Sequence, residues 1–201
     1  MKVLAIDLSS ARGSAAVATG GRVIDQRYFA CERGRGAGVF AALEAMRNSW
    51  LGVELIAVGV GPGSYNGLRA SCALTISMQL STGARLCSSP SPCILEVRDN
   101  HFFVYGDARG GRAYRAEVRD RSLCGEVVLL DYAAAAESAE KDGAAALRVG
   151  PLACLEHLPE AQPDASVLAL LAPGLPPLEP DALQPIYLKP PHITVPRAVR
   201  T

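Results

Sequence analysis

The chain has 201 residues, of which 49% are hydrophobic and 20% are charged, and its 20 basic side chains are balanced by 20 acidic ones. This length and composition predict a globular protein with a sizeable core and exclude a chain that is disordered by composition. The zero formal net charge also excludes binding of nucleic acid by bulk electrostatic attraction, which needs clustered, uncompensated Lys and Arg.

The first half of the chain is predicted to form a three-stranded meander, followed by a helix, a strand, a second helix and a last strand. The apolar runs predict strands at 3–6, 14–18, 22–29, 54–60 and 85–88. Helical periodicity joins Val39, Leu43, Met46 and Trp50 in a helix that ends near Gly52, and Leu68, Cys72, Ile76 and Leu80 in a helix that ends at Gly83. A cluster of Ser and Pro at 88–92 is the candidate domain boundary.

The second half loosely repeats the first. In both halves an apolar strand ends on an aspartate, Asp7 or Asp107, a turn of small residues follows, and the chain returns as a strand. The remaining predicted elements are strands at 102–105, 112–118, 125–130 and 145–149 and helices at 132–141 and 151–158. We therefore expect two related lobes, at 1–92 and 98–201, of which the second is abbreviated. The proline-rich tail from Pro159 is predicted to pack as extended chain.

Targeting segments and metal sites are not expected. Only four apolar positions precede Asp7, and no apolar run approaches the roughly 18 residues of a membrane span, so we expect a cytoplasmic protein with no membrane contact. The six cysteines form no C-x-x-C pair and the three histidines form no H-x-x-x-H pair. We therefore expect reduced thiols and no metal centre.

The glycine-rich loop at 61–69 is the most distinctive feature of the sequence. A loop of this kind before a helix can present free N–H groups to an anion. It is no Walker A loop, however, and the third glycine of a G-x-G-x-x-G fingerprint comes one place late. A G-x-S-x-G elbow is also absent, because Pro62 and Asn66 flank Ser64. The simpler interpretation is a tight strand-to-helix connection, with Ser64 or Asn66 as the N-cap.

Two further groups of residues allow more than one interpretation. Asp7 and Asp107 could hold a magnesium ion or orient a water between the lobes, but aspartate is also the commonest residue at such turns. The arginines of 98–121, which are interleaved with Phe103, Tyr105 and Tyr114, could contact phosphates or stack on bases. Acidic residues among them favour a solvated hairpin face instead.

Four segments spread over nearly the whole chain resemble the TsaB (YeaZ-like) family: 4–10, 61–69, 107–114 and 185–189. The resemblance implies an actin-like, Hsp70-like ATPase fold of the ribonuclease H-like kind, with two related lobes. The positions that match the family motifs are Asp7, Gly61, Pro62, Gly63, Ser64, Gly67, Arg69, Asp107 and Arg109.

The resemblance also implies a function. Proteins of this family are noncatalytic subunits in the bacterial synthesis of threonylcarbamoyladenosine beside the tRNA anticodon, with the catalytic paralogue TsaD and the ATPase TsaE as partners and tRNA as an indirect one. We therefore expect no catalytic residue and no cofactor, with a nucleotide bound at most weakly or at a partner interface. The expected surface for TsaD or for a homodimer consists of Val39, Leu43, Met46, Trp50, Leu68, Cys72, Ile76 and Leu80, unless these side chains are core.

The sequence departs from the family pattern in the region expected to meet partners. Leu8 and Asn66 stand where threonine is usual, and 33–39 has glycines where a histidine is common. The alternative function is an active actin-like ATPase or phosphotransferase that uses Asp7, Asp107 and the glycine loop. The third class, a glycopeptidase, is disfavoured by the missing metal ligands.

Overall fold

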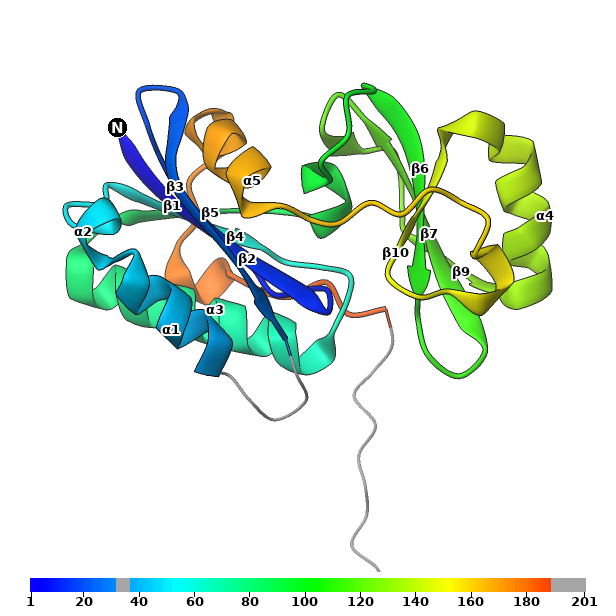
Figure 1. The fold of residues 1–201 in the computed structure, drawn as a ribbon, viewed down its shortest axis with the longest axis horizontal. Coiled ribbons are helices and arrows are strands. Elements are labelled where there is room, and N and C mark those ends of the chain that lie inside the picture. The colour runs from blue at the N-terminus through cyan, green and yellow to red at the C-terminus, as the bar shows by residue number, and fades with distance from the viewer. Residues whose placement is uncertain (32–36, 189–201) are drawn as a thin grey trace, which may run out of the picture.

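Two lobes, each built around one β-sheet, lie side by side along the long axis of the molecule (Figure 1). The structure, a computed structural model, describes residues 1–31 and 37–188. Within these residues no helix is both long enough and apolar enough to cross a membrane.

The first sheet has five strands in the order β3-β2-β1-β4-β5. Its strands are β1 (Lys2–Asp7), β2 (Arg12–Thr19), β3 (Arg22–Ala30), β4 (Leu55–Gly59) and β5 (Arg85–Ser89). The first three strands form the predicted antiparallel meander, and β4 and β5 run parallel to β1. Strands β1 and β4 are apolar at nearly every position because helices cover both faces of the sheet.

Helices α1 (Ala37–Ala45), α2 (Arg47–Trp50) and α3 (Tyr65–Thr82) cover one face of this sheet, and α5 (Ala165–Leu171) covers the other (Figure 1). Side chains alternate along β1, so that Leu4 and Ile6 pack in the core under α1 to α3 and Val3 and Ala5 pack against α5. The single helix predicted up to Gly52 is broken at Met46 into α1 and α2.

The second sheet repeats the arrangement of the first with fewer elements. Its strands are β6 (His101–Asp107), β7 (Arg112–Arg119), β8 (Ser122–Leu123), β9 (Val128–Asp131) and β10 (Ala146–Val149). Strand β6 pairs antiparallel with β7 and parallel with β10, just as β1 pairs with β2 and β4. In the described residues nothing corresponds to β5. The predicted fold is therefore confirmed: an actin-like α/β fold with two related lobes, of which the second is abbreviated.

Helix α4 (Tyr132–Asp142) confirms the helix predicted at 132–141, and it covers one face of the second sheet. The described residues also form five short 3-10 turns, at Ser91–Ile94, Gly143–Ala145, Ala153–Leu155, Ala172–Gly174 and Pro180–Ala182. Of the helix predicted at 151–158, only the short turn Ala153–Leu155 forms.

The tail differs from the prediction. It is extended in part, but Asp164 caps a regular helix, α5, by accepting a hydrogen bond from the backbone N of Ser166 at 2.7 Å. Leu168 and Ala169 of this helix are buried against the first sheet. Although α5 lies within 98–201, it completes the core of the first lobe, and the division of the chain near 92–98 stays a prediction.

Candidate functional site

The glycine loop connects β4 to α3 and packs against the turn that follows β1. The Ser64 backbone N donates to the Ser9 carbonyl at 2.7 Å, and the Ser64 side chain caps α3 by accepting from the Gly67 N at 3.3 Å. A Cβ on Gly63 would collide with the Ser9 carbonyl, and a Cβ on Gly67 would collide with the Leu8 carbonyl. The glycines are therefore required because two backbone segments approach each other closely here.

Ser91, which follows β5, joins the same junction. Its backbone N donates to the Gly61 carbonyl at 2.9 Å, and its hydroxyl accepts from the Gly61 N at 3.0 Å. The backbone N–H groups of Gly61 and Ser64 therefore both donate to other groups of the protein. The loop holds three chain segments together, which agrees with the interpretation as a tight strand-to-helix connection.

Asp7 lies at the centre of this junction and is fully buried. Its Oδ1 accepts from the Ser9 N at 2.9 Å and from the Ser9 hydroxyl at 2.7 Å, and its Oδ2 accepts from the Ser91 hydroxyl at 2.7 Å. A Cβ on Gly59 would fall on the carboxylate itself. Burial raises the pKa of Asp7, and the serine hydrogen bonds oppose this effect. The Asp7 carboxylate is therefore enclosed by protein atoms.

Asp107, the counterpart of Asp7 in the second lobe, is in a different environment. It is half-buried, and its Oδ1 accepts from the Arg109 backbone N at 2.8 Å while its Oδ2 forms an ion pair with Arg109 Nη1 at 3.2 Å. Arg109 has a positive φ of 62°, as the turn requires. Each aspartate therefore stabilises the turn that follows its own strand. Within the described residues no group of three or more His, Cys, Asp or Glu is placed to hold a metal ion.

The side chains expected to form a partner surface are mostly core. Met46 is fully buried, and Val39, Leu43, Leu68 and Cys72 are each at most 6% exposed. Trp50 is half-buried, with its indole N–H donating to the Leu43 carbonyl at 2.9 Å, and Ile76 is partly buried. The expectation that these stripes face a partner is wrong for the buried positions, because both stripes pack on the first sheet.

The outer face of the same helices carries different residues. Phe40 is 61% exposed and Leu80 is 75% exposed. Helix α3 has Arg69 as its one charged residue, and its other exposed positions include Ala70, Ala73 and Ser77. Sequence reasoning included Leu80 but missed Phe40, which lies one position away from the buried stripe. Asn66 is exposed at the start of this face, whereas Leu8 is buried and 33–36 lie outside the described residues.

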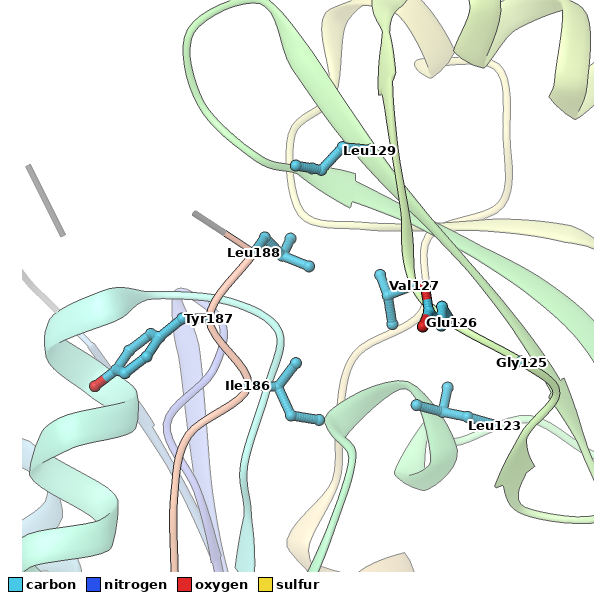
Figure 2. Close-up of a pocket in the computed structure, with 8 residues that line it drawn as sticks. All are labelled: Leu123, Gly125, Glu126, Val127, Leu129, Ile186, Tyr187 and Leu188. Atoms are coloured by element: carbon cyan, nitrogen blue, oxygen red, sulfur yellow. The ribbon is translucent and has the colours of Figure 1, made fainter. Parts of the chain in front are cut away.

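A strap formed by Pro185 to Leu188 runs between the two lobes. Figure 2 shows Ile186 and Leu188 on the side of a pocket of about 440 Å³, opposite Leu129 and Val127 of the second lobe, while Tyr187 points the other way, towards α3. The Tyr187 and Tyr65 rings lie 5.1 Å apart, and the Arg69 guanidinium lies 5.4 Å from the Tyr65 ring. Lys189, the last residue of the family-like segment 185–189, lies outside the described residues.

The arginine-rich hairpin of β6 and β7 is largely held by the protein itself. Arg115 pairs with Asp142 through two hydrogen bonds of 2.8 Å, and Tyr105 donates to the same carboxylate at 2.6 Å. Burial tends to raise the pKa of Asp142, but these hydrogen bonds outweigh it and lower the pKa. Tyr105 and Tyr114 are buried, so the idea that they stack on bases is wrong. The structure therefore favours the interpretation of this stretch as a solvated hairpin face.

Known proteins resemble this chain in structure but not detectably in sequence. No family model matches the chain, and no curated protein is significantly similar to it in sequence. Among solved structures, YeaZ from Pseudomonas aeruginosa is similar over 93% of this chain and 99% of its own, with a TM-score of 0.71 and 22% identity. The chain has the fold of YeaZ.

A second solved structure agrees with this result. It is a protein from Pseudomonas aeruginosa described as having similarity to peptidase YeaZ, and it matches 94% of this chain and 99% of its own, with a TM-score of 0.75 and 19% identity. The chain therefore matches nearly the full length of these YeaZ-like structures, including the abbreviated second lobe.

Proposed function

We propose that this chain is a member of the TsaB (YeaZ-like) family and acts as a noncatalytic scaffold or activator subunit. Its role is in the bacterial synthesis of threonylcarbamoyladenosine in tRNA, as the partner of a TsaD-like catalytic subunit that works with a TsaE-like ATPase. The full-length likeness to YeaZ and the four family-like segments support the family. The enclosure of Asp7 carries the noncatalytic role.

An actin-like phosphotransferase that used Asp7 would need this carboxylate to reach a metal ion, a water or a phosphate in the space between the lobes. Both oxygens of Asp7 instead accept hydrogen bonds from Ser9 and Ser91, and the side chain is fully buried. Exposing the carboxylate would break these bonds and open the packed junction. This arrangement supports a structural role for the residue.

The partner surface that we propose is the outer face of α1 and α3, not the buried stripes. Figure 1 shows both helices on the same face of the first sheet. Phe40 and Leu80 provide exposed apolar side chains, and the low charge of α3 reduces the cost of removing this face from water. A face of two helices can bind either a related subunit or a second copy of this chain, in competition with each other.

The test measures binding of the purified full-length chain to TsaD from the same host by sedimentation velocity. Wild-type protein should form a complex, and Phe40→Glu and Leu80→Glu should each weaken it at least about tenfold, because a buried unpaired charge costs several kcal/mol. Val128→Glu is the matched control, since Val128 is 46% exposed but lies on the second lobe. Binding that is unchanged by both α1 and α3 substitutions would place the interface elsewhere.

Calorimetry with ATP separates this function from the ATPase alternative. The isolated chain should neither bind ATP at micromolar concentration nor turn it over. Micromolar binding with turnover that Asp7→Asn abolishes would overturn the scaffold proposal in favour of an active enzyme.

A further inference from the structure

A second pocket, of about 620 Å³, lies between the β2–β3 hairpin of the first lobe and the segment that follows β10 in the second. Arg12 and Tyr28 line it on the first-lobe side, and Gly150, Pro151 and Gln162 are among the residues on the other side. This volume is within the range of small-molecule binding sites. The pocket takes no part in the scaffold role proposed above.

Unsatisfied polar atoms are concentrated at this pocket. With respect to the described part of the chain, Arg12 Nε and Gln162 Oε1 are shielded from solvent and have no hydrogen-bond partner, and the same holds for Nε of Arg148, which contacts two lining residues. The orientation of the Gln162 amide is fixed, because its Nε2 donates to Glu160 Oε1 at 2.5 Å and a flip would bring two acceptor oxygens together. The pocket therefore has an unused donor on Arg12 and an unused acceptor on Gln162.

The charges around the pocket are unevenly matched. Arg148 Nη1 is bound by Glu160 Oε2 and by the Gly150 carbonyl, each at 2.7 Å. The Arg12 guanidinium instead lies 4.5 Å from the centre of the Tyr28 ring, and among residues 1–31 and 37–188 it has no ion-pair partner. One unneutralised guanidinium suits a single carboxylate, which it can bind through two N–H groups.

A polyphosphate fits this set of groups poorly. It would bring several negative charges close to the Glu160 carboxylate, with Arg12 as the one cation that is not already neutralised in the described part of the pocket. On the opposite wall, Gln162 Oε1 and Glu160 are acceptors, so the complementary ligand group is an N–H donor.

We propose that this pocket binds a small amino carboxylate of amino-acid chemistry. Its carboxylate binds Arg12, its amino group donates to Gln162 and Glu160, and its apolar side chain packs against Tyr28 and Pro151. Such a ligand contacts both lobes at once. Binding requires the Arg12 and Gln162 side chains to shift enough to present the shielded atoms.

The experiment titrates full-length protein, carrying ¹⁵N-labelled arginine, with L-phenylalanine and follows the arginine Nε–Hε resonances by NMR. The resonance of Arg12, assigned from its absence in Arg12→Gln, should shift and saturate. Phenylalanine amide, which lacks the carboxylate, and 3-phenylpropanoate, which lacks the amino group, should each bind at least about tenfold more weakly. Competition between L-amino acids for the same shift then defines the preferred side chain.

Variants locate the binding site. Arg12→Gln should reduce the affinity for L-phenylalanine at least about tenfold, as measured on the ligand signals. Gln162→Leu should also reduce this affinity, although Arg12 is still present in that variant. Arg22→Gln is the control, because Arg22 is an exposed arginine on the same hairpin. Thermal unfolding confirms that each variant is folded.

Several results would overturn the proposal. The first is that no L-amino acid causes a saturable shift of the Arg12 resonance, which would mean that water satisfies the shielded polar atoms. The second is binding that survives Arg12→Gln, which places the ligand elsewhere. The third is an equal or stronger shift with ATP or inorganic phosphate, which contradicts the ligand class. If the wild-type chain binds amino acids but does not bind TsaD, the scaffold role is contradicted and the proposal for this pocket is not.

Discussion

At the scale of single residues, the burial of Asp7 determines how stability should respond to pH. The folded state raises the pKa of this carboxyl, chiefly by burial, so the folded protein holds the Asp7 proton more tightly than the unfolded chain does. The contribution of Asp7 to stability is thus fully present below the ordinary aspartate pKa and is lost as the pH rises through the folded-state pKa.

We predict that Asp7→Asn removes this part of the pH dependence. Asparagine stays neutral and its oxygen can still accept from Ser9, so the variant should lose less stability than wild type as the pH rises above the ordinary aspartate pKa. Urea unfolding at several pH values measures the effect, and the exposed Asp181→Asn is the control. Identical pH profiles for Asp7→Asn and wild type would show that the carboxyl is not perturbed in this direction.

At the scale of elements, the glycine loop acts as a connection between segments distant in sequence. Gly63→Val would push a branched side chain into the Ser9 carbonyl, and the expected loss is about 1–3 kcal/mol in the free energy of unfolding, typical of overpacking. Urea unfolding is the measurement. Gly174→Val is the matched control, because a Cβ at Gly174 meets nothing within 4 Å. If both variants unfold at the same urea concentration, the loop does not pack as described.

Elements also show where sequence reasoning succeeded. The central strands β1 and β4 were predictable because both faces of the sheet are covered there and each of the two is therefore a nearly continuous apolar run. The Ser64 N-cap and the end of α3 at Gly83 were predictable because each uses a residue suited to that position. Helix α5 was missed because its seven residues lie between Pro163 and Pro173, in a stretch whose composition favours extended chain.

At the scale of the whole molecule, periodicity could identify which side chains share a helix face but not what that face contacts. The stripe through Leu43 and Met46 packs on the sheet of its own chain. The same pattern would arise at an interface between subunits. The enclosure of Asp7 was also beyond sequence reasoning, because Ser91, which supplies one of its hydrogen bonds, lies 84 residues further along the chain.

The return of α5 to the first lobe has a consequence for synthesis on the ribosome. The strands of the first sheet are made within the first 89 residues, but the helix that covers one face of them is made only at residues 165–171. Until then the face that includes Val3, Ala5 and Leu55 has no cover from α5. The nascent first lobe is therefore expected to stay open to chaperones, and to aggregation, while the second lobe is being translated.

A truncation tests this order of events. A chain that ends at Pro163 lacks α5 and should fail to unfold cooperatively and should aggregate, whereas a chain that ends at Leu188 keeps every described element and should behave as the full-length protein does. Circular dichroism during urea unfolding, together with light scattering, measures both properties. Cooperative unfolding of a soluble monomer that ends at Pro163 would mean that the first lobe matures without its last helix, independently of how far translation has proceeded.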